Sequence, residues 1–214
     1  YDSDAMTAAE IQAFLDARIG TCLNGNCLNV ATIPYPGRAR EVSRTTGNLI
    51  CEAIPSGNMR VSELIYQAQV ACGISAKVIL VTLQKEQGLV LSKAPSDYAL
   101  RWAMGMACPD TAPCDTLYYG FFNQVYSASS QFQRYRANPG GYRHPVGVPF
   151  DVYLHPNSNP AIKNPPSCGT QNVVIRNLSK SFGAPQKALA SVTLTTGVTS
   201  WLVKSPSLMP VTSI

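Results

Sequence analysis

The chain has 214 residues, of which 45% are apolar and only 14% charged, and its mean hydropathy is close to zero. This composition excludes a solvated disordered chain, and the length suits one domain with a well-buried core. No apolar run approaches the ~20 residues of a membrane helix, so we expect no membrane span, and no DNA-binding motif accompanies the net charge of +5.

The first helix is marked by its own capping residues. Thr7 and Glu10 have the spacing of a capping box, in which a hydroxyl and a carboxylate bond the first free N–H groups. Apolar residues at helical spacing follow, so residues 8–18 should form an amphipathic helix. Residues 30–60 hold several prolines and glycines and should be an irregular connection.

Two further helices are predicted next. Ser62 should cap a helix over residues 63–71, and Ser75 should cap another over residues 76–87 that ends at Gly88. The segment 76–87 is the most apolar of the chain. We therefore expect a central helix that is buried on nearly all sides.

The later part of the chain is mostly loop. Asn123 should cap a helix over residues 124–136, with Phe132 and Tyr135 in the core. Residues 173–175 should be a short strand, and weak alternation at Leu189, Val192 and Leu194 hints at another. The expected loops are residues 95–120 and 137–170.

Seven cysteines predict disulfides rather than a metal site. Only two histidines accompany them and no C-x2-C pair is present, so we expect no metal and no cofactor. Two pairs enclose short loops rich in turn residues, and two more cysteines are left to pair. Such bridges indicate a secreted protein whose signal has been removed, whereas buried thiols in a reducing cell are the alternative. The expected bridges are Cys22–Cys27, Cys108–Cys114 and Cys51–Cys72, with Cys168 left over.

These elements predict a mainly helical fold, α+β at most, with disulfide-stapled loops. Residues 1–60 should pack on a core over 61–176, and residues 177–214 should form a divergent tail. We expect a monomer. Residues 116–214 carry eight basic side chains and a single acid, which fits either a solvated surface or attraction to an anionic wall polymer.

Glu86 is the catalytic candidate. On a helix it shares a face with Ile79 and Leu83. A carboxylate at the end of a buried helix loses hydration, which raises its pKa toward neutrality. Such an acid can protonate a glycosidic oxygen. The alternatives are a side chain in solvent or one paired with Lys85.

A second carboxylate is less clearly marked. Asp110 and Asp115 flank the loop closed by Cys108 and Cys114. Either could orient a water molecule or stabilise an oxocarbenium-like state. An aspartate in such a loop more often forms a turn, and an enzyme that uses a group of its own substrate needs no second acid.

Aromatic residues are concentrated in one region. Ten of the 18 fall within residues 118–153. Flat rings with polar tips, interspersed with amides, suit the apolar faces and hydroxyls of sugars. We therefore expect a saccharide cleft lined by Tyr119, Phe122, Asn123, Gln124 and Tyr126.

Three stretches carry a resemblance to a known group of proteins. They are MTAAEIQAFLDARIGTC (6–22), ACGISAKVILVTLQKEQGLV (71–90) and AMGMACPDTAPCDTLYYGFFNQVYSASSQFQRYR (103–136). They look like secreted actinobacterial proteins that are often labelled hypothetical or hemagglutinin-like. The core of that group is similar to the lysozyme-like superfamily of lytic transglycosylases and goose-type lysozymes.

The resemblance implies a function. In that superfamily a helix-terminal glutamate is the acid, and a later glycine-led turn contacts the sugar. Glu86-Gln87-Gly88 resembles the first element, and residues 120–124 resemble the second loosely, with Asn123 or Gln124 as the amide. The implied activity is cleavage of the bond between N-acetylmuramic acid and N-acetylglucosamine in peptidoglycan, by hydrolysis or transglycosylation, with Gln87 also at the substrate.

The chain departs from that group at its end. After residues 173–177 the group continues into an aromatic-rich helical segment that holds the partner of the last cysteine, whereas residues 178–214 here contain no cysteine. We therefore expect an unpaired Cys168 and a divergent or frame-shifted tail. The alternatives to the enzyme are a non-catalytic module that binds cell-wall glycan and a hydrolase of another wall polysaccharide.

Overall fold

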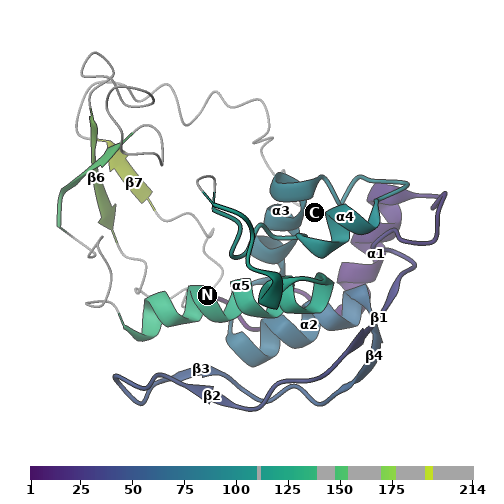
Figure 1. Ribbon diagram of the computed structural model, residues 1–214, viewed down its shortest axis with the longest axis horizontal. Helices are drawn as coiled ribbons and strands as arrows, with labels where there is room; N and C mark the ends of the chain where they lie inside the picture. The colour runs from purple at the N-terminus through teal and green to yellow at the C-terminus, as the bar shows by residue number, and fades with distance from the viewer. Residues whose placement is uncertain (110–111, 139–147, 154–169, 177–190, 195–214) are drawn as a thin grey trace. The chain divides into compact units, whose positions relative to one another are not determined.

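The computed structural model describes residues 1–109, 112–138, 148–153, 170–176 and 191–194. The chain divides into two compact units, residues 1–141 and 142–214. Residues 1–60 belong to the same unit as the helices that follow them (Figure 1). The boundary predicted at residue 177 stays a prediction.

The first predicted helix is confirmed as α1, Ala8–Ile19. Thr7 Oγ1 accepts a hydrogen bond from the Glu10 amide at 3.2 Å, and Glu10 Oε2 accepts one from the Thr7 amide at 2.7 Å. The capping box is therefore complete. One face of α1, carrying Ile11 and Leu15, is buried, and the helix packs on α2.

Helix α2, Val61–Cys72, begins two residues earlier than predicted. Its cap is Arg60, whose amide donates to Glu63 Oε2 at 3.1 Å. Ser62, predicted as the cap, instead donates from its hydroxyl to Gln12 Oε1 of α1 at 2.8 Å. Glu63 thus bonds the amide of the residue before the helix, and the Ser62 side chain joins two helices instead of capping one.

Helix α3 has the predicted bounds, Ala76–Gln87, and ends at Gly88 in the left-handed conformation. The prediction that it is buried on nearly all sides is wrong. Leu83 is fully buried, but Val81 is 59% exposed, and Lys77 and Lys85 are also exposed. The helix packs against α2 on one side, so an apolar composition does not give it neighbours all round.

The irregular connection predicted over residues 30–60 is wrong, because this segment forms two antiparallel ribbons. Strand β1, Thr32–Tyr35, pairs with β4, Gly57–Arg60, and β2, Glu41–Val42, pairs with β3, Leu49–Cys51. Pro34 lies within β1, where a two-stranded ribbon has an outer edge that needs no N–H donor. The ribbons run along α2 and α5 (Figure 1).

The predicted loop 95–120 holds two short helices, α4, Asp97–Arg101, and the 3-10 helix η1, Thr116–Tyr118. After it, α5 covers Phe121–Ala137 and starts three residues before the predicted start. Its cap is Gly120, whose φ of +95° lets the chain turn into the helix. Asn123 is therefore not a cap but part of the first helical turn.

The core-facing side of α5 was predicted only in part. Phe132 is partly buried against the core, as expected, whereas Tyr135 is 43% exposed. The buried side chains of α1, α2, α3 and α5 form one continuous cluster with Leu28, Ile50 and Leu89. This core confirms a mainly helical fold with small β-elements. Its largest apolar side chains with no more than trace exposure are Ile11, Leu15, Ile19, Leu28, Ile50, Ile65, Ile79, Leu83 and Leu89.

The three expected disulfides are present, Cys22–Cys27, Cys51–Cys72 and Cys108–Cys114. In the chain-entropy account, each short loop stabilises the fold by about 2 kcal/mol, and the longer loop, which joins β3 to the end of α2, by about 3 kcal/mol. Several disulfides are consistent with an extracellular protein. Cys168 lies outside the described residues.

The second unit contains an antiparallel sheet of order β5-β6-β7, with strands Phe150–Tyr153, Thr170–Arg176 and Ser191–Leu194. The strand predicted at 173–175 is confirmed and is longer, and the second strand is present as β7, which contains Val192 and Leu194, while Leu189 lies outside the described residues. Strand β5 falls in the predicted loop 137–170. Across the described ranges, no helix is long and apolar enough to cross a bilayer.

The one-sided burial of α3 predicts unequal effects of two substitutions on stability. Leu83→Ala should lower the free energy of unfolding by about 2–5 kcal/mol, because it leaves a cavity in the core. Val81→Ala, on the exposed side of the same helix, should change it by less than about 0.5 kcal/mol. Urea denaturation of both variants measures this, and equal losses would contradict the described packing.

Candidate functional site

A groove with a volume of about 510 Å³ lies in the first unit, between β1, α4 and the start of α5. This volume is typical of a small-molecule site. Three of the predicted cleft residues, Tyr119, Phe122 and Asn123, line it. The full lining is Ile33, Pro34, Pro36, Asp97, Leu100, Arg101, Tyr119, Gly120, Phe121, Phe122 and Asn123.

Local hydrogen bonds place α4 beside the start of α5. Ser96 Oγ accepts a bond from the Ala99 amide at 3.1 Å and so caps α4. The Gly120 amide donates to the Arg101 carbonyl at 3.0 Å. The end of α4 and the beginning of α5 are thereby joined at the groove.

Gly120 carries no side chain to cap α5, so the first N–H groups of the helix give this end of the groove a partial positive charge.

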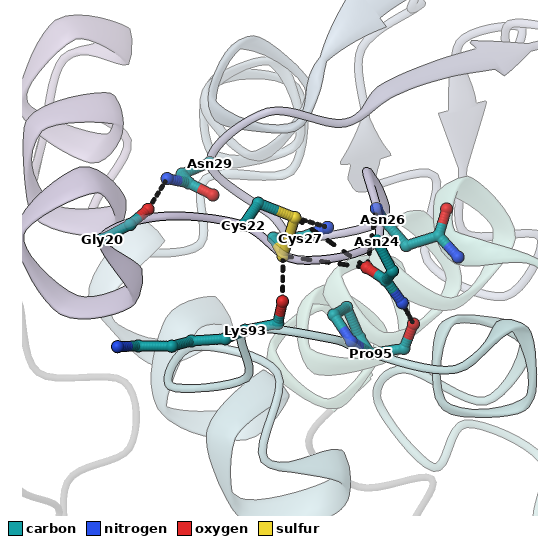
Figure 2. The surroundings of a disulfide bond; sticks show 8 residues. All are labelled: Gly20, Cys22, Asn24, Asn26, Cys27, Asn29, Lys93 and Pro95. Atoms are coloured by element: carbon teal, nitrogen blue, oxygen red, sulfur yellow. Dashed lines mark hydrogen bonds between the residues drawn. A yellow bond between two sulfur atoms is a disulfide. The ribbon is translucent and has the colours of Figure 1, made fainter.

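The disulfide loop 22–27 holds the other end of α4 (Figure 2). Asn24 Nδ2 donates to the Pro95 carbonyl at 2.8 Å, and the Leu23 amide donates to the Lys93 carbonyl at 2.8 Å. Asn26 Nδ2 donates to Asp97 Oδ1 at 2.9 Å. Three residues of the loop therefore fix the segment that leads into the groove.

Tyr119 and Asn123 are held in place on the groove wall. Asn123 Nδ2 donates to the Tyr119 carbonyl at 2.8 Å, and Asn123 Oδ1 accepts from Arg38 Nη2 at 2.6 Å. The Tyr119 ring meets the Trp102 ring edge to face, with centroids 5.4 Å apart. Both predicted residues thus have fixed orientations before any ligand arrives.

Tyr126, predicted to contact substrate, lies behind the groove. Its ring is buried and stacks on Phe122, and the Arg38 guanidinium lies 5.3 Å from its centroid. Its hydroxyl donates to Glu41 Oε2 at 3.3 Å, and Glu41 is also ion-paired with Arg134. Burial, followed by the negative charge of Glu41, raises the pKa of Tyr126 to about 12. Tyr126 supports the groove wall and is not among the residues that line it.

Gln124, the second predicted amide, is fully buried. Its Oε1 accepts from the Met104 and Met106 amides at 3.1 and 3.0 Å, and its Nε2 donates to the Met106 and Tyr118 carbonyls at 3.0 and 2.8 Å. All of its polar capacity serves the backbone, so the expectation that it lines the cleft is not met.

Glu86 lies in the last turn of α3 with its side chain 31% exposed. Lys85 Nζ donates to Glu86 Oε1 at 3.0 Å, so the alternative of an ion pair with Lys85 is the one observed, and the expected buried carboxylate is not. The pair is weak, about 0–1 kcal/mol, because the Lys85 side chain is 78% exposed. Neither Glu86 nor the half-buried Gln87 lines the groove.

The other oxygen of Glu86 lies against Gly105. A β-carbon built on Gly105 would stand 2.8 Å from Glu86 Oε2, and the glycine has a φ of +65°. The Gly105 amide donates to the Trp102 carbonyl at 3.0 Å. Residues 101–105 therefore form a short stretch that has Arg101 on the groove at one end and Glu86 at the other.

Asp115, one of the two predicted second carboxylates, does not join this arrangement. Asp115 Oδ1 accepts from the Leu117 amide at 3.0 Å and caps η1, which is the turn-forming alternative. Asp110 lies outside the described residues. Over the ranges that the structure describes, no three His, Cys, Asp or Glu side chains gather where a metal ion could bind.

Sequence reasoning missed the residues that α4 contributes. Asp97 and Arg101 line the groove four positions apart on that helix. Ser96 followed by Asp97 is a helix-start signal that could have revealed α4. Gly105 has no such signal, because its role depends on a side chain from α3.

Comparison of the chain with protein-family models, curated proteins and solved structures gave no match.

The buried amide of Gln124 leads to a prediction about stability. Gln124→Leu should lower the free energy of unfolding by at least about 2 kcal/mol, because it leaves buried backbone groups without partners. Gln131→Leu is the control on the same helix, since the one side-chain bond of Gln131 to the described part of the chain is a 3.4 Å bond that it accepts from Arg134. Chemical denaturation compares them, and similar small effects would show that the network does not hold the loop.

The raised pKa of Tyr126 predicts a dependence of stability on alkaline pH. An ordinary tyrosine titrates near 10.0, and Tyr126 at about 12, so between these values the unfolded chain releases a proton that the folded protein keeps. The free energy of unfolding should fall as pH rises through this window. Tyr126→Phe should fall less steeply and lack a late phase in phenolate absorbance. An unchanged late phase would contradict the assignment.

Proposed function

We propose that the chain is a secreted enzyme that cleaves the glycan strands of peptidoglycan, with Glu86 as general acid. The observation that carries the proposal is the position of the Glu86 carboxylate. It ends α3, stays partly accessible, and contacts Gly105 on the stretch that leads to the groove. The resemblance of residues 71–90 and 103–136 to secreted lysozyme-like proteins adds support, as do the disulfides typical of exported proteins.

The groove would bind the sugar chain. The Tyr119 ring offers a face to the apolar side of a pyranose, and Asn123 has remaining hydrogen-bonding capacity for hydroxyl or acetamido groups. Both side chains are already oriented by bonds within the protein, which lowers the entropy lost on binding. A strand that runs from the groove along residues 101–105 would bring a glycosidic bond to Glu86.

The chemical step would be protonation of the leaving oxygen. A glycan over Gly105 would place its glycosidic oxygen within reach of the Glu86 carboxyl group. The Glu86 proton passes to the glycosidic oxygen as its bond to C1 breaks. Water or the 6-hydroxyl of the muramic acid residue then attacks C1 and releases a proton, which returns the acid to its starting form. The muramic acetamido group can assist, so the scheme needs no second protein carboxylate.

The test is the Glu86→Gln variant, which removes the proton and keeps the shape. Release of muropeptides should fall by at least ~10²-fold, while binding to peptidoglycan stays unchanged. Glu52→Gln is the matched control, because Glu52 is an exposed glutamate paired with Arg40 at 3.2 Å and lies away from the groove lining. Its release rate should equal that of the unmodified protein.

Mass spectrometry of the released fragments separates the two chemical outcomes. Anhydro ends would indicate transglycosylation, and reducing ends would indicate hydrolysis. Equal turnover by Glu86→Gln and the unmodified protein would remove Glu86 as the acid.

A non-catalytic module that binds cell-wall glycan is the second candidate. The observation that favours it is that Glu86 is absent from the groove lining. In that case the protein would bind peptidoglycan and form no new ends. Tyr119→Ala would weaken this binding by roughly 2–10-fold through loss of ring contacts.

A further inference from the structure

We propose that the groove selects saccharides that carry a free carboxylate, and that Arg101 is the residue that recognises this group. The inference rests on the proposed function in one respect, that the groove is a saccharide site. It goes further by assigning the chemical class of the sugar and the residue that determines it.

Arg101 is an exposed arginine on the groove wall, at the end of α4. Its guanidinium carbon lies 5.8 Å from the centroid of the Tyr119 ring and 6.0 Å from that of Trp102. Contact with the two rings restricts the side chain. The charge is therefore positioned next to the aromatic surface that would hold a sugar.

Three other arginines of this unit spend their N–H groups on protein acceptors. Arg40 pairs with Glu52, Arg134 pairs with Glu41, and Arg38 donates to Asn123. For Arg101, no carboxylate of the described residues lies within ion-pairing distance. A guanidinium that lines a groove and has no carboxylate partner in the protein suits an anionic ligand.

Asp97, the carboxylate that lines the groove, bonds the disulfide loop and not Arg101. Asp97 stands one helical turn before Arg101, but its Oδ1 accepts the bond from Asn26 in the disulfide loop. The carboxylate is thus held toward residues 22–27 and forms no ion pair with Arg101. Among the groove-lining residues, Arg101 is consequently the positive side chain whose N–H groups are available to an anion.

The arrangement matches an acidic sugar. A guanidinium binds a carboxylate through two parallel hydrogen bonds, while the neighbouring tyrosine contacts the apolar face of the same pyranose. A neutral sugar would leave the guanidinium with water only. Two sources supply this chemistry, namely the lactyl carboxylate of an N-acetylmuramic acid residue that has lost its peptide, and the ring carboxylate of a uronic acid.

The experiment is calorimetric titration with a matched pair of ligands. One is the disaccharide of N-acetylglucosamine and N-acetylmuramic acid with its lactyl carboxylate free, and the other is the same disaccharide with that group converted to a methylamide. Hyaluronan tetrasaccharide, which carries uronic acid, and the neutral chitin tetrasaccharide form a second pair. At least one acidic ligand should bind roughly 10-fold or more tightly than its neutral counterpart, and the pair that shows the difference identifies the source.

Variants assign the effect to Arg101. Arg101→Gln should abolish the preference, so that the acidic ligand binds no more tightly than its neutral counterpart. Arg18→Gln is the control, since Arg18 is an exposed arginine that lies 5.3 Å from the Phe14 ring on α1, outside the groove lining. It should retain the full preference. Unaltered thermal unfolding would show that both variants remain folded.

The outcomes also separate this inference from the proposed function. Equal binding of acidic and neutral ligands, or a preference that survives Arg101→Gln, would overturn the role of Arg101 and leave the proposed enzyme intact. No binding of any saccharide would overturn both this inference and the assignment of the groove. Failure of the Glu86→Gln test alone would leave the carboxylate preference standing.

Discussion

The first unit depends on one buried amide group. The segment between α4 and α5 has little regular structure, and its backbone groups need partners once they are enclosed. Gln124 supplies them from inside α5 by bonding the backbone at residues 104, 106 and 118. Both ends of the loop are thereby fastened to one helix. A loop without this fastening would have no defined path over the core.

That path determines where the chemistry of the molecule lies. Along it, Arg101 and Tyr119 reach the groove, and Gly105 passes beneath the carboxylate of Glu86. The opposite wall comes from β1, and α4 is held from outside by the loop of the Cys22–Cys27 disulfide. The groove is therefore built from segments that are far apart in sequence, and each is fixed by its own hydrogen bonds.

The sequence predicted best what depends on neighbouring residues. The capping box at Thr7, the stop of α3 at Gly88 and the two disulfides that close short loops are local properties, and the structure confirms them. The ribbons in residues 30–60 were missed because prolines break central strands but are tolerated at an edge. The exposure of Glu86 and the burial of Gln124 depend on which neighbouring elements each helix packs against. The hydrophobic periodicity of a single helix does not contain this information.

Gly105 has a consequence for how such a chain can change over time. Any other residue at position 105 would be strained, because the backbone there is left-handed. Its β-carbon would also occupy the space of the Glu86 carboxylate. A mutation there would displace the acid without altering it, so the two sites are expected to evolve as a pair. A descendant that loses the glycine can keep its glutamate as a relic whose carboxylate no longer reaches its former place.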